Sequence, residues 1–207
     1  MYAKQGGLEG PFAGPVAWDD PGTPAAWSRS VAGQTAKFVG WWALWVGVLY
    51  VTVGVLPEWA AIPAALVLCV IAYNAVMSGD RLGKFRRMRR ILKTYPWRRQ
   101  PGGVQYDPRG RKAQFRLPDP DKPEKSVSPK LSGLFLRPWD RIARKGVDEI
   151  VYAGDPRFAC VIAEPGPRSL SYVSQPTAYN RRTSPRRKGL SPEARQRARA
   201  IGARVAD

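Results

Sequence analysis

Seven basic side chains lie close together in one stretch of the chain: Arg81, Lys84, Arg86, Arg87, Arg89, Arg90 and Lys93. Guanidinium and ammonium groups at this density bind phosphate oxygens, either of anionic lipid head groups or of a nucleic-acid backbone. Phe85, Tyr95 and Trp97 lie among these cations, and such aromatic side chains could also stack on bases. The cluster therefore indicates phosphate recognition, and the elements that position it decide which phosphate it meets.

The chain offers little else that could do chemistry. It contains no histidine, the commonest general base and metal ligand. Its two cysteines, Cys69 and Cys160, are far apart in sequence, and no phosphate-binding loop, dinucleotide fingerprint or nucleophile elbow occurs. Asp119, Asp121 and Glu124 fall in a stretch rich in proline and lysine, which predicts a loop with solvated carboxylates. We therefore expect no catalytic residue, no metal, no cofactor and no enzymatic activity.

The element that positions the basic cluster is a pair of long apolar runs directly before it. Residues 38–56 and 59–77 are uncharged. Each run is long enough to cross a bilayer as a helix, which takes about 20 apolar residues. Pro57 and Glu58 separate the runs, so we expect a transmembrane helical hairpin over residues 37–77. Two buried helices of a soluble protein would rarely carry such long uncharged runs.

The distribution of charge orients this hairpin. The 207 residues include 34 Lys and Arg against 16 Asp and Glu, a net charge of +18, and all but Lys4, Arg29 and Lys37 of the basic residues lie at or beyond Arg81. The turn between the spans has no basic residue. Because basic flanks stay on the cytoplasmic side, we expect a plasma-membrane protein with both termini in the cytoplasm.

Gly40, Gly47 and Gly54 recur every seven residues and share one side of the first helix. Small residues let a neighbouring helix approach closely in lipid. Two uses remain open besides chance: packing within the hairpin, against the alanines that begin the second run, or association of hairpins into a homo-oligomer.

Residues 78–97 predict a basic amphipathic helix, separated from the span by a break at residues 78–80, Ser-Gly-Asp. Its apolar residues return every three or four positions, and the cations fill the remaining surface. This pattern is typical of a helix that lies in the membrane interface with its cations on head groups. Two alternatives stay open: a cluster that only sets the orientation, and one that binds nucleic acid or a protein. The apolar residues of this face are Leu82, Phe85, Met88, Leu92 and Tyr95.

The rest of the chain predicts one folded module between two disordered ends. Residues 1–36 are rich in glycine and proline without an apolar period, so we expect disorder. Residues 100–176 predict a small β-rich domain, an antiparallel sheet or barrel, with a hairpin turn at Gly154–Arg157 that only reverses the chain. Residues 177–207 predict a basic tail with a short helix that starts at Ser191 and orders on an acidic surface.

Two segments carry a resemblance to a known group. TYPWRR, residues 94–99, and VYAGDPRFACVIAEPG, residues 151–166, resemble segments of small uncharacterised actinobacterial membrane proteins with two spans and a short cytoplasmic β domain. The resemblance covers residues 38–173 and no catalytic motif. Cys160 stands where the similar sequences lead us to expect glycine, which argues against a required thiol.

These features together predict a non-catalytic membrane anchor or adaptor that presents a basic cytoplasmic module at an anionic inner leaflet. Its expected partners are anionic lipids, a cytoplasmic protein and a second copy of the chain. Two other functions stay open: a membrane-tethered nucleic-acid-binding protein, and an oligomerising subunit of a larger membrane complex.

Overall fold

The computed structural model describes residues 16–55, 57–107, 112–131, 139, 149–175, 178, 190–203 and 205. They belong to two compact units, one made of residues 27–86 and the other of the residues before Trp27 together with those from Arg87 onward. We call them the hairpin unit and the β module. The boundaries between the two units fall within two long helices, α1 (Gly22–Gly54) and α2 (Ala61–Thr94).

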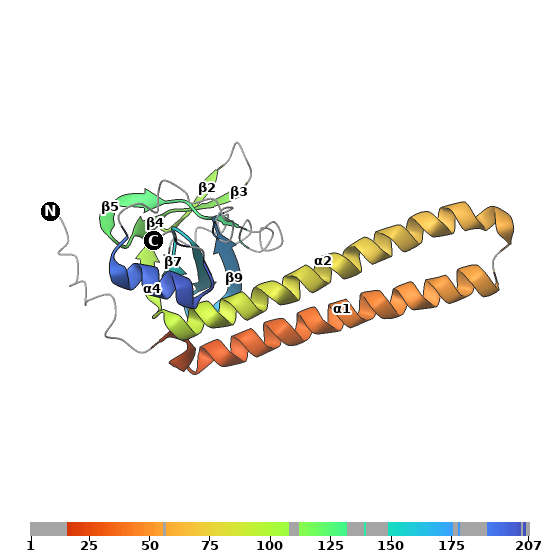
Figure 1. The fold of residues 1–207 in the computed structure, drawn as a ribbon, viewed down its shortest axis with the longest axis horizontal. Helices are drawn as coiled ribbons and strands as arrows, with labels where there is room; N and C mark the ends of the chain where they lie inside the picture. The colour runs from red at the N-terminus through yellow and green to blue at the C-terminus, as the bar shows by residue number, and fades with distance from the viewer. Residues whose placement is uncertain are drawn as a thin grey trace. The chain divides into compact units, whose positions relative to one another are not determined.

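In the hairpin unit α1 and α2 run side by side and antiparallel (Figure 1), joined by the 3-10 turn η2 (Glu58–Ala60). The less exposed residues of α1 recur at alternating steps of three and four, from Val31 to Thr52. Those of α2 do the same from Ala64 to Phe85. This spacing is that of two helices packed along a shared seam. Both helices are long and apolar enough to cross a membrane, as the sequence predicts.

The glycine face of α1 does not take part in this seam. A Cβ atom added at Gly40, Gly47 or Gly54 would meet nothing within 4 Å. Of the two uses left open for these glycines, packing against α2 is therefore not the one that the structure shows, and association of hairpins stays a prediction. The close approach occurs on α2 instead, where a Cβ at Gly79 would lie 3.3 Å from Cε2 of Phe38.

The predicted break at residues 78–80 does not exist, because α2 continues without interruption to Thr94. Glycine costs a helix about 1 kcal/mol relative to alanine, and here that cost is offset by seam packing around a buried Ser78. The apolar face that we expected to lie in lipid is covered by protein. Its members Phe85, Met88, Leu92 and Tyr95 are all at most 6% exposed.

The N-terminal segment is ordered from Val16 onward, contrary to the prediction of disorder through residue 36. The short 3-10 helix η1 (Ala17–Asp19) precedes α1, and the N–H of Ala17 donates to the carbonyl of Tyr95 at 2.9 Å. Trp97 Nε1 donates to the buried hydroxyl of Thr23 at 2.9 Å. Residues 1–15 lie outside the described residues. Long-range contacts, which no local pattern signals, hold this segment in place.

The β module contains a five-stranded antiparallel sheet in the order β1-β7-β8-β9-β6. Its central strands β7 (Glu149–Asp155), β8 (Ala159–Glu164) and β9 (Arg168–Ser174) are the three consecutive strands that the alternation predicts. The edges are β1 (Arg98–Pro101) and β6 (Lys130–Leu131), so the described strands form an open sheet. Of the two predicted alternatives, an antiparallel sheet or a barrel, they show the antiparallel sheet.

Two small hairpins complete the described strands. β2 (Val104–Asp107) pairs with β3 (Lys112–Phe115), and β4 (Leu117–Asp119) pairs with β5 (Lys122–Val127). The second hairpin occupies the stretch for which a loop was predicted. Leu117 and Val127 are buried at its base, and this burial stabilises strands that the prolines and lysines of the stretch disfavour.

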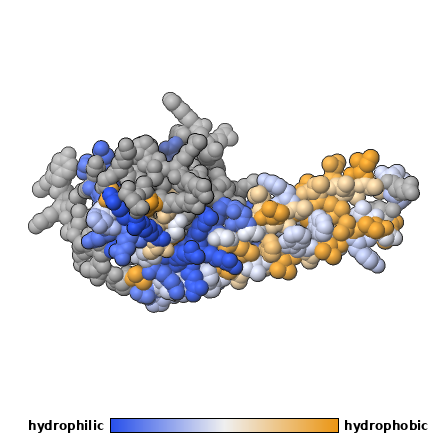
Figure 2. All heavy atoms as spheres, in the orientation of Figure 1, coloured by the Kyte–Doolittle hydropathy of each residue, from blue (hydrophilic) through white to orange (hydrophobic). Residues whose placement is uncertain are grey.

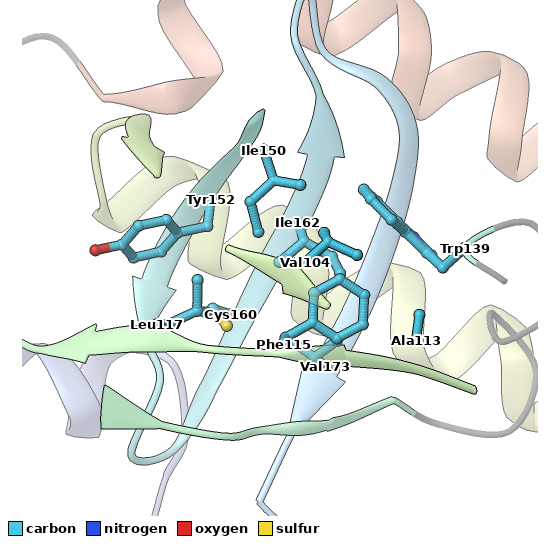
Figure 3. Packing of buried hydrophobic residues seen from close by; sticks show 10 residues of the cluster. All are labelled: Val104, Ala113, Phe115, Leu117, Trp139, Ile150, Tyr152, Cys160, Ile162 and Val173. Carbon is cyan, nitrogen blue, oxygen red and sulfur yellow. The ribbon is translucent and has the colours of Figure 1, made fainter. Parts of the chain in front are cut away.

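The hydrophobic core lies between the sheet and these hairpins (Figure 3). Phe115 and Trp139 meet edge to face with ring centroids 5.3 Å apart, and Trp139 Nε1 donates to the Ser171 hydroxyl at 2.7 Å. β7 and β8 are buried on both faces, since Ala153 and Val161 of the opposite face are also inaccessible. The core residues are Val104, Ala113, Phe115, Leu117, Trp139, Ile150, Tyr152, Cys160, Ile162 and Val173.

The tail helix α4 (Pro192–Ala200) begins as predicted, with the Ser191 hydroxyl accepting from the N–H of Ala194 at 3.3 Å. It does not need an acidic surface to order, because Ala194, Ala198 and Ile201 are buried. The basic run of the tail, residues 181–189, lies wholly outside the described residues.

Candidate functional site

The basic segment, residues 81–93, forms the last three and a half turns of α2. Its cations occupy the surface left by the buried apolar face: Arg86, Arg87, Arg89, Arg90 and Lys93 are exposed, whereas Arg81 and Lys84 are half-buried. Lys84 pairs with Asp80 one turn earlier, at 2.6 Å. The side chains predicted to bind phosphate therefore lie on one continuous helix, and the exposed surface of this segment is almost wholly cationic.

Two of these cations contact an aromatic ring of the N-terminal segment. The guanidinium of Arg89 lies 5.3 Å from the ring centroid of Trp18, and the ammonium of Lys93 lies 5.7 Å from it. Cation–π contacts of this kind contribute about 0.5–1 kcal/mol at exposed sites. They help to position the Arg89 and Lys93 side chains.

A second charged cluster lies in the β module, around Arg157. Its side chain is only 4% exposed and contacts the Asp155 carboxylate through Nε at 3.0 Å and NH2 at 2.7 Å. NH1 contacts Asp121 and lies 3.3 Å from Asp119. The turn that was predicted only to reverse the chain therefore also holds a buried ion-pair cluster. Of the three carboxylates predicted to be solvated, Asp121 and Glu124 are exposed residues, whereas Asp119 is half-buried.

The carboxylates hold Arg157 in its charged form. Burial lowers the pKa of Arg157, but the hydrogen bonds and negative charges of Asp155 and Asp121 outweigh it, and the net pKa lies above the ordinary value. The cluster joins the β4–β5 hairpin to the turn between β7 and β8. Within the described residues no three acidic, cysteine or histidine side chains could hold a metal ion.

A pocket of about 260 Å³ opens beside this cluster. Its wall includes Tyr95 at the end of α2 and the first turn of α4. The Tyr95 hydroxyl is buried and has no hydrogen-bond partner. Burial raises the pKa of Tyr95, and the negative charge of Asp155 adds to the shift, so the phenol stays neutral. The pocket is lined by Tyr95, Arg98, Pro120, Asp121, Gly154, Asp155, Arg157, Ser191, Glu193, Ala194 and Arg197.

Two further cations line the pocket, Arg98 of β1 and Arg197 of α4. The guanidinium of Arg197 lies 6.0 Å from the ring centroid of Tyr95. Burial lowers the pKa of Arg197, and the positive charge of Arg98 lowers it further, while Tyr95 and Glu193 act in the opposite direction. Two guanidinium groups thus line the same cavity.

Sequence reasoning did not identify this pocket. Tyr95 counted as one more apolar residue of a helix face, and Arg197 as one cation in a basic tail. A signal was present, however, because the segments that carry the resemblance, residues 94–99 and 151–166, supply Tyr95, Arg98 and Arg157. Cys160, in contrast, is completely buried, and burial raises its pKa well above the ordinary value, so its thiol is unreactive.

Neither the known family models, nor the curated proteins, nor the solved structures contain a match to this chain, so the resemblance stays a prediction.

Proposed function

We propose that the protein is a non-catalytic integral membrane anchor or adaptor, which crosses the plasma membrane twice and presents the β module at the cytoplasmic face of an anionic bilayer. The observation that carries the proposal is the apolar surface of the hairpin unit (Figure 2). In the described part of the chain, every large apolar side chain that is exposed lies between Val39 and Val76. Soluble monomers rarely expose apolar patches beyond a few hundred Å².

The contacts of the N-terminal segment support the two-span topology. Ala17 and Thr23 form hydrogen bonds with Tyr95 and Trp97, so the chain before the hairpin and the chain after it lie together. A path that starts and ends on one side of a membrane crosses it an even number of times. The basic segment then favours the cytoplasm as that side, because basic flanks resist translocation.

Contact with anionic lipid would come from the exposed cations of the basic segment. Because its apolar face is buried in protein, the segment binds head groups by charge and not by insertion. Each cation near an anionic leaflet contributes about 1 kcal/mol. A cytoplasmic protein partner, or a second copy of the chain, would then bind a module held at the membrane.

Accessibility of engineered thiols tests the topology. In a background with Cys69 and Cys160 replaced by serine and alanine, Glu58→Cys places a thiol in the turn, and Arg168→Cys places one on the exposed start of β9. A membrane-impermeant maleimide added to intact cells should label the first and not the second. Labelling of Arg168→Cys, or extraction of the protein by alkaline carbonate, would overturn the proposal.

Lipid preference tests the anchor function against its alternative, a membrane-tethered nucleic-acid binder. The full chain is reconstituted into nanodiscs with and without anionic lipid, and neutral discs are titrated with DNA and RNA at matched salt. The variant with Arg86, Arg87 and Arg90 changed to glutamine should lose anionic-lipid enrichment. A control with Arg168, Arg195 and Arg199 changed to glutamine removes the same number of charges and should retain the enrichment of anionic lipid. Tight nucleic-acid binding without lipid enrichment would favour the alternative.

A further inference from the structure

Two side-chain nitrogen atoms among the described residues of the hairpin unit are buried without a hydrogen-bond partner. They are Nε2 of Gln34 and Nε of Arg81. Both are N–H donors, so neither nitrogen can accept a hydrogen bond from the other. Buried polar groups in native proteins are nearly always paired, and an unpaired one calls for an explanation. A group that accepts hydrogen bonds from both nitrogens supplies it.

The packing of α1 on α2 brings the two donors to the same level. Gln34 belongs to the seam of α1, and Arg81 flanks the seam of α2, three residues after the buried Ser78. The contact of Phe38 with Gly79 fixes the register of the two antiparallel helices. Away from η2, Gln34 is four residues further along than Phe38. Arg81 is two residues further along than Gly79, so at about 1.5 Å per residue the donors lie within about one turn of each other.

Both donors lie just outside the apolar runs. Gln34 precedes the run 38–56 by four residues, and Arg81 follows the run 59–77 by four, so each lies about 6 Å beyond the end of its run. A bilayer has a hydrocarbon core about 30 Å thick and measures about 40–45 Å with its head groups, so each head-group layer is about 5–8 Å deep. In the proposed membrane placement, the two donors therefore lie at the depth of the lipid phosphates.

The charges at this end of the hairpin unit favour an anionic acceptor. Arg81 carries one positive charge, and Lys37 is exposed on the same part of α1. The hairpin unit has two acidic residues: Glu58 lies in η2 at the opposite end, and Asp80 pairs with Lys84 at 2.6 Å. A phosphodiester carries one negative charge and several acceptor oxygens, and a guanidinium matches it in geometry as well as in charge.

We propose that this end of the seam binds the phosphodiester of one phospholipid, with the Arg81 guanidinium and the Gln34 amide as hydrogen-bond donors and the Lys37 ammonium beside them. The proposal rests on the proposed function, since the two helices must cross a bilayer for this end to meet lipid phosphates. Gln34 and Arg81 are half-buried as whole residues, so rotation about their side-chain bonds brings each N–H to the surface of the seam. The bound lipid then joins α1 to α2 where both helices leave the hydrocarbon core.

Native mass spectrometry of the full chain, delipidated in neutral detergent, counts the lipids that each chain retains. Phosphatidylglycerol is titrated beside diacylglycerol, which has the same tails and no phosphate, and inorganic phosphate is titrated by calorimetry as the arm without tails. We expect one retained phosphatidylglycerol per chain and no saturable binding of the other two. Equal retention of diacylglycerol shows a lipid held by its tails alone, and tight binding of inorganic phosphate shows a site for a soluble anion. Either result, or no retained lipid, overturns the proposal.

Three variants locate the binding site. Arg81→Gln should weaken retention of phosphatidylglycerol by about thirty-fold or more, since it removes a charged donor. Gln34→Leu should weaken it about ten-fold, because it removes a single hydrogen bond to a charged group. Arg168→Gln removes the same charge as Arg81→Gln from the exposed start of β9 and should retain the lipid as the parent does.

Thermal midpoints separate lipid binding from a purely structural role. A lipid that binds the folded hairpin raises the midpoint of the parent, and it should raise that of Arg81→Gln much less. Gln34→Leu deletes an unpaired donor and should keep the midpoint of the parent in the absence of lipid. If both variants lower the midpoint without lipid and retain phosphatidylglycerol as Arg168→Gln does, the donors only support the seam and the proposal is wrong. The anchor function stands in that case, provided that nanodiscs still enrich anionic lipid around the parent.

Discussion

Replacement of Arg157 by methionine should unfold the central strands of the β module more readily than any comparable change on its surface. The substitution keeps an unbranched chain but removes the guanidinium that contacts Asp155, Asp121 and Asp119. The Asp155 side chain is only 4% exposed and would be left largely buried without its charged partner. Loss of one partner of a buried ion pair costs about 3–5 kcal/mol.

The structure places this variant at the lower end of that range. The backbone N–H of residue 157 donates to Asp155 Oδ1 at 2.9 Å, and that contact survives the change of side chain. The carboxylates of Asp119 and Asp121 are 16% and 27% exposed and can regain water. We therefore expect a loss of about 3 kcal/mol in the free energy of unfolding.

Hydrogen exchange followed by mass spectrometry measures this loss in the full chain. A loss of about 3 kcal/mol accelerates exchange in β7 and β8 about a hundred-fold, since 1.4 kcal/mol is one decade. Peptides from the hairpin unit serve as the internal reference. The control Arg168→Met makes the same change on an exposed residue of β9 and should stay within about 0.5 kcal/mol of the parent.

A second substitution separates the ion pair from simple loss of packing. In the double variant Arg157→Met with Asp155→Asn, the uncompensated charge is gone. Its destabilisation should fall short of the sum of the single changes by at least about 1 kcal/mol. If Arg157→Met exchanges within about three-fold of Arg168→Met, or if the double variant is simply additive, the cluster does not stabilise the fold as argued.

Three more predictions concern single positions. Gly154→Ala should destabilise the β module by about 3 kcal/mol or more, because its φ is +124° and a Cβ there would lie 2.6 Å from the carbonyl oxygen of Ala159. Gly166→Ala, where φ is +82° and the surrounding space is open, should cost only about 1 kcal/mol, and chemical denaturation of the two variants compares these losses. Burial raises the pKa of Tyr95 and of Tyr152 above 10.0, so the folded state holds these protons more tightly. The contribution of these two phenols to the free energy of unfolding is therefore fully present below about pH 10. It is lost as pH rises further, by up to about 1.4 kcal/mol per pH unit for each phenol. Thermal midpoints between about pH 9 and 12 should show a shallower decline in Tyr95→Phe, and an equal decline would contradict the assignment. Gly79→Leu should separate α1 and α2 where Phe38 packs, and it should therefore lower the thermal midpoint in detergent. Gly47→Leu adds a side chain in open space and should leave the thermal midpoint unchanged. A change in assembly size for Gly47→Leu would instead show that this face binds a second copy of the chain.

The elements with strong local patterns could be predicted from the sequence. The two apolar runs predict two long helices, and alternation around a turn predicts β7, β8 and β9. Ser191, Pro192 and Glu193 give the start of α4 to the residue. In each case a short window contains the whole signal, either a hydrophobic period or a cap.

The elements that depend on distant partners could not be predicted. The Ser-Gly-Asp sequence at residues 78–80 looks like a helix break, and packing along the seam, with Ser78 buried and Phe38 beside Gly79, offsets the cost of the glycine in α2. The N-terminal segment has no period of its own and is held by Tyr95 and Trp97. The pocket combines residues from four separate stretches of the chain, so no spacing within the sequence could predict it.

The hydrogen bond from Ala17 to Tyr95 has a consequence for the order in which the chain is made. Residues 17–23 leave the ribosome long before their partners at 95–97 exist, and the whole of the hairpin is synthesised in between. The β module therefore cannot form this contact until the hairpin has been synthesised and, in the proposed topology, has returned to the side of the membrane where it began. In the proposed two-span topology, a nascent chain with an odd number of crossings would leave its first and last segments on opposite sides of the membrane, and these contacts could not form.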